Sequence, residues 1–403
     1  MPRSRSKRKP PPAAAPYIDS AEKLIPVAKK LAASPLIAFD TEFLWERTYS
    51  PRLGLIQVAD AQSTWLVDPL AVPAKGMEPL LDVLVSADTL KVAHAVDQDQ
   101  ICLHRDYGIV AEPLLDTAVA AALTGMGEQI GLSNLISKLL RIPLDKGYSR
   151  TNWLKRPLSP QMLQYAADDV AHLCEAAGLL LDKLRKLNRE EWALELSAKA
   201  GDVAKAHFEP SSLARKLASA RRLSPRTYCV LRELIAWREG AADHRNLPRR
   251  WMAEDKTLVK LASASPTTRK QLEDFRGLRG VSNPRSAARI LRAIKAGLKS
   301  SPDGYSVPVR PRGPTARESA ALVVLRCFLN ALAAEHRIPA RLLASQEEMV
   351  ALLRAKAGDV EALKESAILA DRVADLIGED LVAILNGRRC LRIVDGKASL
   401  IDG

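Results

Sequence analysis

The first hundred residues alternate between short apolar runs and amphipathic stretches. Four apolar runs have the length and composition of strands, whereas two stretches show apolar residues at helical spacing. The predicted strands are 36–43, 53–59, 64–68 and 90–94, and the predicted helices begin at Ser20 and near Met77. From residue 94 to about residue 196 the pattern is mainly helical. Strands that come first and helices that follow predict an α/β domain with a mixed sheet flanked by helices.

The remainder of the chain shows helical patterns, interrupted by a segment rich in Pro and Gly that has the composition of a linker. Changes of pattern and composition divide the chain into six parts: a disordered basic tail (1–16), the α/β domain (17–195), a linker helix (196–215), a first small helical domain (216–300), the Pro/Gly-rich linker (301–314) and a second helical domain (315–403). Near the C-terminus, residues 388–401 predict a short hairpin.

Aromatic side chains make up only 4% of the 403 residues, so the cores must consist largely of Leu, Ala, Val and Ile. The five cysteines form no Cys-x-x-Cys pair, and the six histidines show no spacing typical of a zinc site. No apolar run is long enough to span a membrane, and no apolar signal-peptide core follows the basic N-terminus. We therefore expect reduced cysteines and a cytoplasmic protein that does not bind membranes.

The formal net charge of +13 is unevenly distributed along the chain. Residues 17–200 carry 19 basic and 24 acidic side chains, whereas residues 201–310 carry 23 basic and 10 acidic ones, an excess of 13. A solvated face of Lys- and Arg-rich helices would account for this excess, but its size favours nucleic-acid binding. An acidic domain joined to a basic one suits a polyanion that the basic domain holds and the acidic domain modifies.

Two carboxylates follow one another closely in the predicted strand 36–43. Because successive side chains of a strand alternate between faces, Asp40 and Glu42 point the same way and lie close enough to share a cation. Their mutual repulsion requires a positive partner, and a divalent metal ion is a suitable one because carboxylate oxygens are hard ligands. A lone Asp-x-Glu is also typical of a strand that ends in a polar turn.

Two further carboxylate clusters follow along the chain. Asp97 and Asp99 follow the end of the fourth predicted strand. They either face a cleft at that end of the sheet or serve as the cap and a first-turn residue of the next helix. Tyr165 and Asp169 are four residues apart in a predicted helix and share a face, which suits a hydroxyl that orients a nucleophilic water beside a metal ligand. Asp168 lies about 100° round that helix, on a more solvated side. The alternative is an ordinary amphipathic helix with a packed Tyr.

Taken in order, the three clusters resemble the exonuclease motifs of the DEDD superfamily, in its tyrosine-containing branch. The resemblance is to the ribonuclease D family in particular, covers most of 17–195, and also rests on three other stretches. These are 47–57 (RTYSPRLGLIQ), 115–117 (LDT) and 144–153 (LDKGYSRTNW). Three motifs in the right order are far more specific than any single one. Family spacing selects Asp99 rather than Asp97, and Asp169 rather than Asp168.

This resemblance implies a ribonuclease H-like fold and a 3′-5′ exoribonuclease that releases nucleoside 5′-monophosphates. It implies two divalent ions, Mg²⁺ or Mn²⁺, which together steady the attacking and leaving oxygens. Asp40 would bridge the ions, Glu42 and Asp169 would hold the ion that activates water, Asp99 would support the other ion, and Tyr165 would orient the water. The implied substrates are tRNA precursors and other structured RNA 3′ ends, and we expect a monomer.

The basic part of the chain resembles the helicase-and-ribonuclease-D C-terminal domain, a small helical module associated with nucleic-acid binding. Arg285, Arg289, Arg292 and Lys295 fall at i, i+4, i+7 and i+10, which predicts a basic stripe suited to backbone phosphates. The other candidate RNA-binding residues are Arg249 and Arg250. A second, weakly similar module is expected at 315–403.

Two other functions are compatible with the same motifs. A DNA exonuclease of the superfamily would use the same residues, because they act on the phosphodiester and not on the 2′-hydroxyl. A catalytically inactive nucleic-acid-binding scaffold would also keep the fold, although here all five metal-binding and water-orienting positions are filled. Only the domain order, with two helical modules after the exonuclease, favours RNA.

Overall fold

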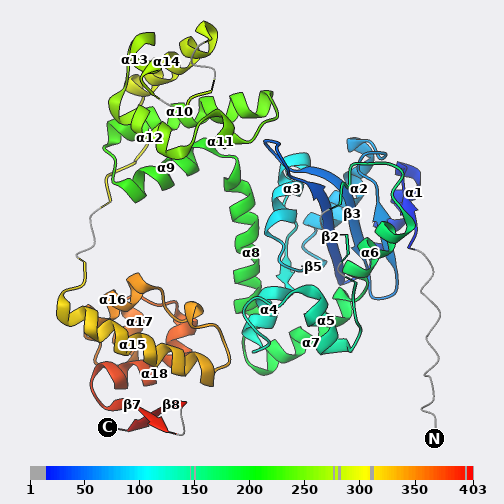
Figure 1. The fold of residues 1–403 in the computed structure, drawn as a ribbon. Coiled ribbons are helices and arrows are strands. Elements are labelled where there is room, and N and C mark those ends of the chain that lie inside the picture. The colour runs from blue at the N-terminus through cyan, green and yellow to red at the C-terminus, as the bar shows by residue number, and fades with distance from the viewer. Residues whose placement is uncertain are drawn as a thin grey trace, which may run out of the picture.

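The computed structural model describes residues 15–145, 147–148, 151–275, 277–279, 283–308, 313–394 and 397–402. Most of the predicted tail at 1–16, and residues 146, 149 and 150 of the motif at 144–153, lie outside these ranges. The chain forms a sheet unit (β1 to α7), a first helical unit (α9 to α14) and a second helical unit (α15 to β8). The helix α8 (Glu190–His207) leads from the sheet unit to the first helical unit (Figure 1).

A six-stranded mixed sheet forms the centre of the sheet unit. Its strands, in spatial order, are β1 (Tyr17–Ile18), β4 (Thr64–Val67), β3 (Arg52–Ala59), β2 (Leu36–Leu44), β5 (Leu90–Ala93) and β6 (Leu114–Asp116). β3 is antiparallel to β4 and β2, whereas the pairs β1 with β4, β2 with β5 and β5 with β6 are parallel. The predicted mixed sheet is confirmed. The strands β1 and β6 were not predicted, because two or three residues are too few to show alternation.

Helices cover both faces of this sheet. On one face lie α1 (Ala21–Ala32), α2 (Ala74–Val85) and α3 (Asp97–Tyr107), and on the other lie α6 (Pro160–Ala171) and α7 (Leu173–Lys186). The alternation of β2 divides its residues between these layers: Ile37 and Phe39 pack toward the first group, and Ala38 toward the second. Two shorter helices, α4 (Thr117–Leu123) and α5 (Leu132–Leu140), complete the unit. The predicted flanking of a sheet by helices is therefore confirmed.

The first helical unit packs around α10. Its helices are α9 (Pro210–Arg221), α10 (Pro225–His244), α11 (Arg249–Met252), α12 (Asp255–Ala264), α13 (Arg269–Glu273) and α14 (Pro284–Lys299). Helix α14 approaches α10 so closely that a Cβ added to Gly297 would lie 2.4 Å from the Cα of Val230. The buried residues of α14 include Ile290 and Ile294, which face this contact, and its basic residues therefore lie on the outer side.

The second helical unit ends in the hairpin that the sequence predicted. Its elements are α15 (Ala316–Glu335), the 3-10 helix η1 (Ala340–Leu342), α16 (Gln346–Ala355), α17 (Val360–Glu365), α18 (Asp371–Leu385), β7 (Arg389–Val394) and β8 (Lys397–Asp402). The strands β7 and β8 pair antiparallel. Helix α8 extends across the domain boundary that the sequence predicted after residue 195. The domain boundaries given above therefore remain predictions.

A cluster around Tyr49 joins the sheet unit to the first helical unit. Tyr49 lies in the loop between β2 and β3, and its ring packs on that of Phe208 with centroids 5.5 Å apart. The guanidinium groups of Arg105 and Arg249 each lie 5.7 Å from the centroid of the Tyr49 ring. The Tyr49 hydroxyl donates a 3.0 Å hydrogen bond to Glu239 of α10. This contact combines buried aromatic area with charge, and we expect it to hold the two units firmly.

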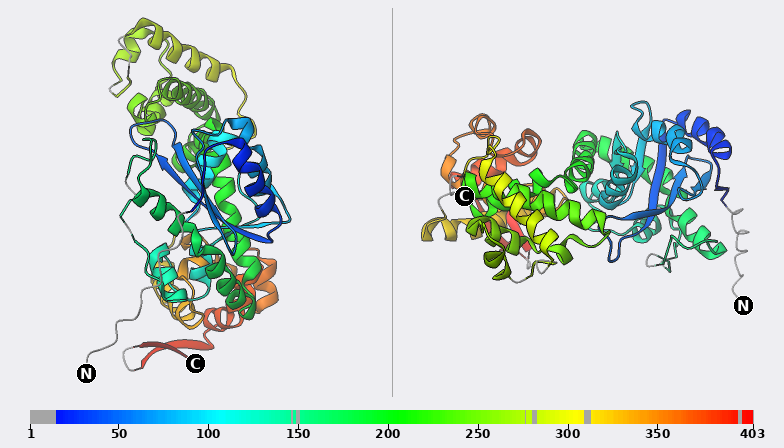
Figure 2. Two further views of the ribbon diagram at one scale, coloured as in Figure 1. Left: turned by 90° about the vertical axis from the view of Figure 1, so that its right-hand side faces the viewer. Right: turned by 90° about the horizontal axis from the view of Figure 1, so that it is seen from above.

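Contacts of another kind join the second helical unit to α8. Arg372 of α18 forms ion pairs with Glu191, at 3.0 Å, and with Glu195, at 2.6 Å. Arg341 pairs with Glu128 of the sheet unit. The two helical units lie one above the other in Figure 1, with the sheet unit beside them, and the left view of Figure 2 shows the same two units at opposite ends of the molecule. Among the described residues, we find no helix whose length and apolar character would let it cross a membrane.

Candidate active site

Three predicted carboxylates meet between β2 and α6. Asp40 and Glu42 point from β2 toward α6, as the strand alternation predicted, and Asp169 comes from α6. One carboxylate oxygen from each of the three lies within 4.8 Å of the others. The pairing of β2 with β3 is irregular between Glu42 and Phe43, and such a bulge increases the local twist beside the site. Residues 129 positions apart in the chain are thereby brought into one acidic cluster.

Asp99 lies next to this cluster but has its own hydrogen bonds. It is only 6% exposed, and its Oδ1 accepts a 3.1 Å hydrogen bond from the backbone N–H of Thr41. The hydroxyl of Thr41 donates to the same oxygen. Because Thr41 stands between Asp40 and Glu42, these bonds fix the start of α3 against the strand that carries the first motif. The structure thus places Asp99 beside the three other carboxylates, without making it part of the tight group.

Asp97 has a different environment from Asp99. It is exposed and is the first residue of α3, whose N-cap is Val96. The turn before α3 is held instead by Asp116, whose carboxylate accepts hydrogen bonds from the backbone N–H groups of Ala95, at 2.9 Å, and Val96, at 3.2 Å. Ala95 has a left-handed backbone with φ of 56°. This role of Asp116 was not predicted, although an Asp at a strand end before a Thr is typical of an N-cap, which Asp116 also is for α4.

Tyr165 lies one turn before Asp169 on α6, and each of the two side chains affects the pKa of the other. Its ring is half-buried and flanked by Tyr148 and Trp153, with centroids 6.0 and 6.2 Å away. Asp168 lies on another side of the helix, where it accepts a 2.8 Å hydrogen bond from Gln164 and lines a separate hollow. The helix therefore directs only Tyr165 and Asp169 toward the carboxylates of β2.

Burial raises the pKa values of all four carboxyl groups, and the neighbouring carboxylates of the cluster raise those of Asp40 and Glu42 further. Burial, together with the charges of Asp169 and Asp99, raises the pKa of Glu42 to about 9. Burial also raises the pKa of Asp99 to about 7, and that of Asp169 to about 7, against the hydrogen bonds that each accepts. The pKa of Asp40 lies well above its usual range because it is buried next to the other three groups.

These residues fit divalent metal ions. Hard carboxylate oxygens are the ligands that Mg²⁺ and Mn²⁺ prefer, and the tight group offers three of them within reach of one cation. A bound cation would also offset the burial and repulsion that raise these pKa values, because positive charge favours the ionised form of a carboxyl group.

The predicted RNA-binding residues are spread over the first helical unit. Arg285, Arg289, Arg292 and Lys295 are all exposed on the outer face of α14, as the stripe pattern predicted. Arg250 is also exposed. By contrast, Arg249 is half-buried, lies over Tyr49 and Phe208, and pairs with Glu239 at 3.4 Å. Its guanidinium is engaged within the protein, so Arg249 has less freedom to reach a phosphate than the other five.

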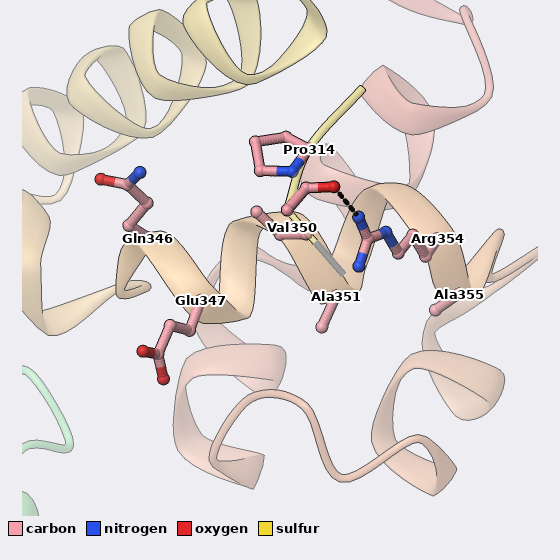
Figure 3. A pocket seen from close by; sticks show the side chains of 8 residues that line it. Pro314, Gln346, Glu347, Val350, Ala351, Arg354 and Ala355 are labelled. Atoms are coloured by element: carbon pink, nitrogen blue, oxygen red, sulfur yellow. Dashed lines mark hydrogen bonds between the residues drawn. The ribbon is translucent and has the colours of Figure 1, made fainter. Parts of the chain in front are cut away.

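A groove on the second helical unit has no comparable chemistry. It is lined by α16 and by Gly313 and Pro314, and Arg354 at its wall donates a 3.1 Å hydrogen bond to the Gly313 carbonyl (Figure 3). Arg354 also pairs with Glu318. Because its lining is mainly apolar and this Arg is already paired, the groove does not compete with the acidic cluster as a reaction site.

Two family descriptions match separate parts of the chain. Residues 16–187 match the 3′-5′ exonuclease family, and residues 229–294 match the HRDC domain. The first match contains all the residues of the acidic cluster, and the second contains Arg249 and most of α14.

Individual proteins are similar over nearly the whole length. The ribonuclease D of Granulibacter bethesdensis is 36% identical over 386 residues, 94% of each chain. That of Sphingobium indicum is 32% identical and covers 96% of this chain and 98% of its own. Among solved structures, Escherichia coli RNase D, described as an exoribonuclease involved in structured RNA processing, matches with a TM-score of 0.72 and 25% identity, over 91% of this chain and 99% of that one.

Proposed function

Because this chain belongs to the ribonuclease D family, and is therefore a 3′-5′ exoribonuclease, we propose that its reaction is carried by the acidic cluster and Tyr165. The observation that supports this assignment is the meeting of Asp40, Glu42 and Asp169 within 4.8 Å. Asp99 completes the set from the start of α3. Two divalent ions, Mg²⁺ or Mn²⁺, would be held here by the carboxylates of Asp40, Glu42, Asp169 and Asp99, with Asp40 shared by both.

The bound ions would lower the pKa of a water molecule and stabilise negative charge on the phosphoryl oxygens. The side chains would orient the reactants. Burial and the nearby carboxylates raise the pKa of Tyr165 above its usual value, so the phenol keeps its proton and would donate it in a hydrogen bond to Asp169. Its oxygen then remains free to accept a hydrogen bond from the attacking water, which directs the lone pair of that water toward phosphorus.

We infer that the substrates are structured RNAs with 3′ extensions, such as tRNA precursors, and that a monomer is sufficient to act on them. The exposed basic face of α14 would contact backbone phosphates, with Arg285, Arg289, Arg292 and Lys295 as the main contacts and Arg250 as a further one. Family membership argues against the two alternative functions, a DNA exonuclease and an inactive scaffold. A cytoplasmic location is part of this proposal.

The proposed roles can be tested with Asp40→Asn in the full-length chain. Asn keeps the size of the side chain but removes the charge that both ions would share. We expect a loss of Mg²⁺-dependent turnover of at least 10³-fold, in the range seen when a residue of a catalytic unit is removed, whereas RNA binding in EDTA stays unchanged. End-labelled RNA and DNA oligonucleotides incubated with Mg²⁺, Mn²⁺ or EDTA would report turnover, polarity and product.

Tyr165→Phe provides the matched variant for the water-orienting role. It removes only the hydroxyl, so turnover should fall while Mg²⁺ affinity stays near the wild-type value. Normal turnover of Asp40→Asn would refute the assignment of the acidic cluster, and normal turnover of Tyr165→Phe would refute that of the phenol. Faster cleavage of DNA than of RNA would favour the DNA alternative.

A further inference from the structure

Gln57 carries a buried amide that the reaction proposed above does not use. Its side chain is 0% exposed, and neither Nε2 nor Oε1 has a hydrogen-bond partner among the described residues. Burying an amide without partners is unfavourable, and an apolar side chain of the same size would avoid that cost. Because buried polar groups in proteins are nearly always hydrogen-bonded, the unpartnered amide of Gln57 needs an explanation other than packing.

The strand register places Gln57 beside the acidic cluster. In the pairing of β2 with β3, Gln57 lies directly opposite Asp40. Directly opposite residues of antiparallel strands point to the same face, with their Cβ atoms about 5 Å apart. Glu42 lies one step further along the same face of β2. The amide of Gln57 is thus next to two of the carboxylates that meet at the candidate active site.

The other neighbours of Gln57 on this face are apolar. Leu66 is opposite on β4, and Leu55 and Ala59 lie two residues away on β3 itself. On the covering helix α6, the residues that pack over Leu55 and Leu66 include Ala166. Within the sheet, the charged hydrogen-bond acceptor that lies directly opposite the amide is therefore the Asp40 carboxylate of β2.

We propose that Gln57 is a positioning residue: with a cation bound at the acidic cluster, its Nε2–H, unpartnered among the described residues, would donate a hydrogen bond to the Asp40 carboxylate and hold it in the orientation that binds metal. This inference rests on the proposed function of the acidic cluster. An amide suits this role because it donates a hydrogen bond without adding positive charge, so Asp40 keeps its full charge for a cation. A Lys or Arg at the same place would compete with the metal for that charge.

The test is Gln57→Met in the full-length protein. Met has nearly the length and volume of Gln but no hydrogen-bonding amide, so the packed layer is preserved. We expect the melting temperature in EDTA to be equal to or above that of the wild type, because an unpartnered amide is removed. The Mg²⁺ dissociation constant, measured by isothermal titration calorimetry, should rise about 10-fold, as it does when supporting partners of metal ligands are lost. The kcat on RNA should fall by a similar factor with KM unchanged.

Leu66→Met is the matched control, because it alters the same layer on the other side of Gln57 without touching Asp40. It should leave metal affinity and kcat at wild-type values. The inference would be overturned by a Gln57→Met protein that binds Mg²⁺ as tightly as the wild type does. It would also be overturned if both variants showed equal decreases in stability and kcat and equal changes in KM. A wild-type protein without exoribonuclease activity would instead refute the proposed function, while weaker Mg²⁺ binding by Gln57→Met would still support the inference.

Discussion

At the scale of single residues, Thr41 connects two motifs that lie far apart in the sequence. Its backbone N–H and its hydroxyl both donate to Asp99, while its neighbours Asp40 and Glu42 face the acidic cluster. One residue of β2 thereby fixes the distance between the first and second motifs. Replacing Thr41 with Val would remove the hydroxyl but keep the backbone bond, so Asp99 would lose one of two constraints.

The raised pKa values give a prediction about pH and metal. A carboxyl group whose pKa is higher in the folded than in the unfolded chain keeps a proton that the unfolded chain loses, so stability falls as pH rises between the two values. Here that window extends from the unfolded values near 4 to about 7 for Asp99 and Asp169 and about 9 for Glu42. We expect the melting temperature in EDTA to fall by roughly 5 °C between pH 5 and pH 9.

Saturating Mg²⁺ should abolish most of this decrease, because the cation stabilises the ionised carboxylates. Differential scanning calorimetry in matched buffers would measure the effect. As a control, Asp40→Asn removes one of the interacting charges and should show a smaller decrease in EDTA. A melting temperature that rises from pH 5 to pH 9 without metal would contradict the cause given for the raised pKa values.

At the scale of elements, the features that depend on local sequence pattern were predicted correctly. The alternation of β2 correctly placed Asp40 and Glu42 on one face, and the helical spacing correctly placed Tyr165 and Asp169 together. The strand β6 is too short to show a pattern, and the hydrogen bonds that Asp116 accepts from the turn before α3 could not be predicted because that turn lies about 20 positions away in the chain. The burial of Gln57 under α6 depends on packing that no local pattern reveals.

Two glycines of the first helical unit provide a matched pair for testing helix packing. Gly297 of α14 faces the backbone of α10, and an added Cβ would lie 2.4 Å from the Cα of Val230. Gly240 of α10 is exposed, and nothing lies within 4 Å of its Cβ position. We expect Gly297→Ala to destabilise the protein by about 1–3 kcal/mol, as overpacking does, and Gly240→Ala to stabilise it by about 1 kcal/mol through helix propensity.

Urea unfolding followed by circular dichroism would measure both changes. If Gly297→Ala were as stable as Gly240→Ala, the close approach of α14 to α10 would be incorrect. The orientation of α14 would then be incorrect as well, because the Gly297 contact determines which side of this helix, and therefore which basic residues, face outward.

At the scale of the whole molecule, the excess positive charge and the acidic cluster lie in different units. The sheet unit carries the carboxylates, whereas the first helical unit carries the exposed stripe on α14. Binding and hydrolysis of RNA should therefore be separable by mutation. Substitutions in the stripe should weaken binding without changing the metal dependence of the reaction.

Replacing Arg285, Arg289, Arg292 and Lys295 together with Ala tests this separation. Each phosphate contact to a single strand contributes about 0.7 to the slope of log K against log salt, so the slope should decrease by roughly 2–3. Fluorescence anisotropy of a labelled RNA at several salt concentrations would measure it. A matched variant that replaces four exposed lysines of the sheet unit and α8, which are Lys75, Lys183, Lys186 and Lys199, should keep the wild-type slope. Equal slopes for both variants would mean that α14 does not contact the RNA backbone.

The cluster around Tyr49 has an evolutionary consequence. Tyr49 lies in the sheet unit, while its partners Phe208, Glu239 and Arg249 are encoded about 160 to 200 codons later. A substitution at Tyr49 removes a contact from all three partners at once, so changes at these four positions should be correlated among relatives. The sheet unit and the first helical unit are thus constrained to evolve together, and a chimera that joins them from two relatives should function only if all four residues come from the same parent.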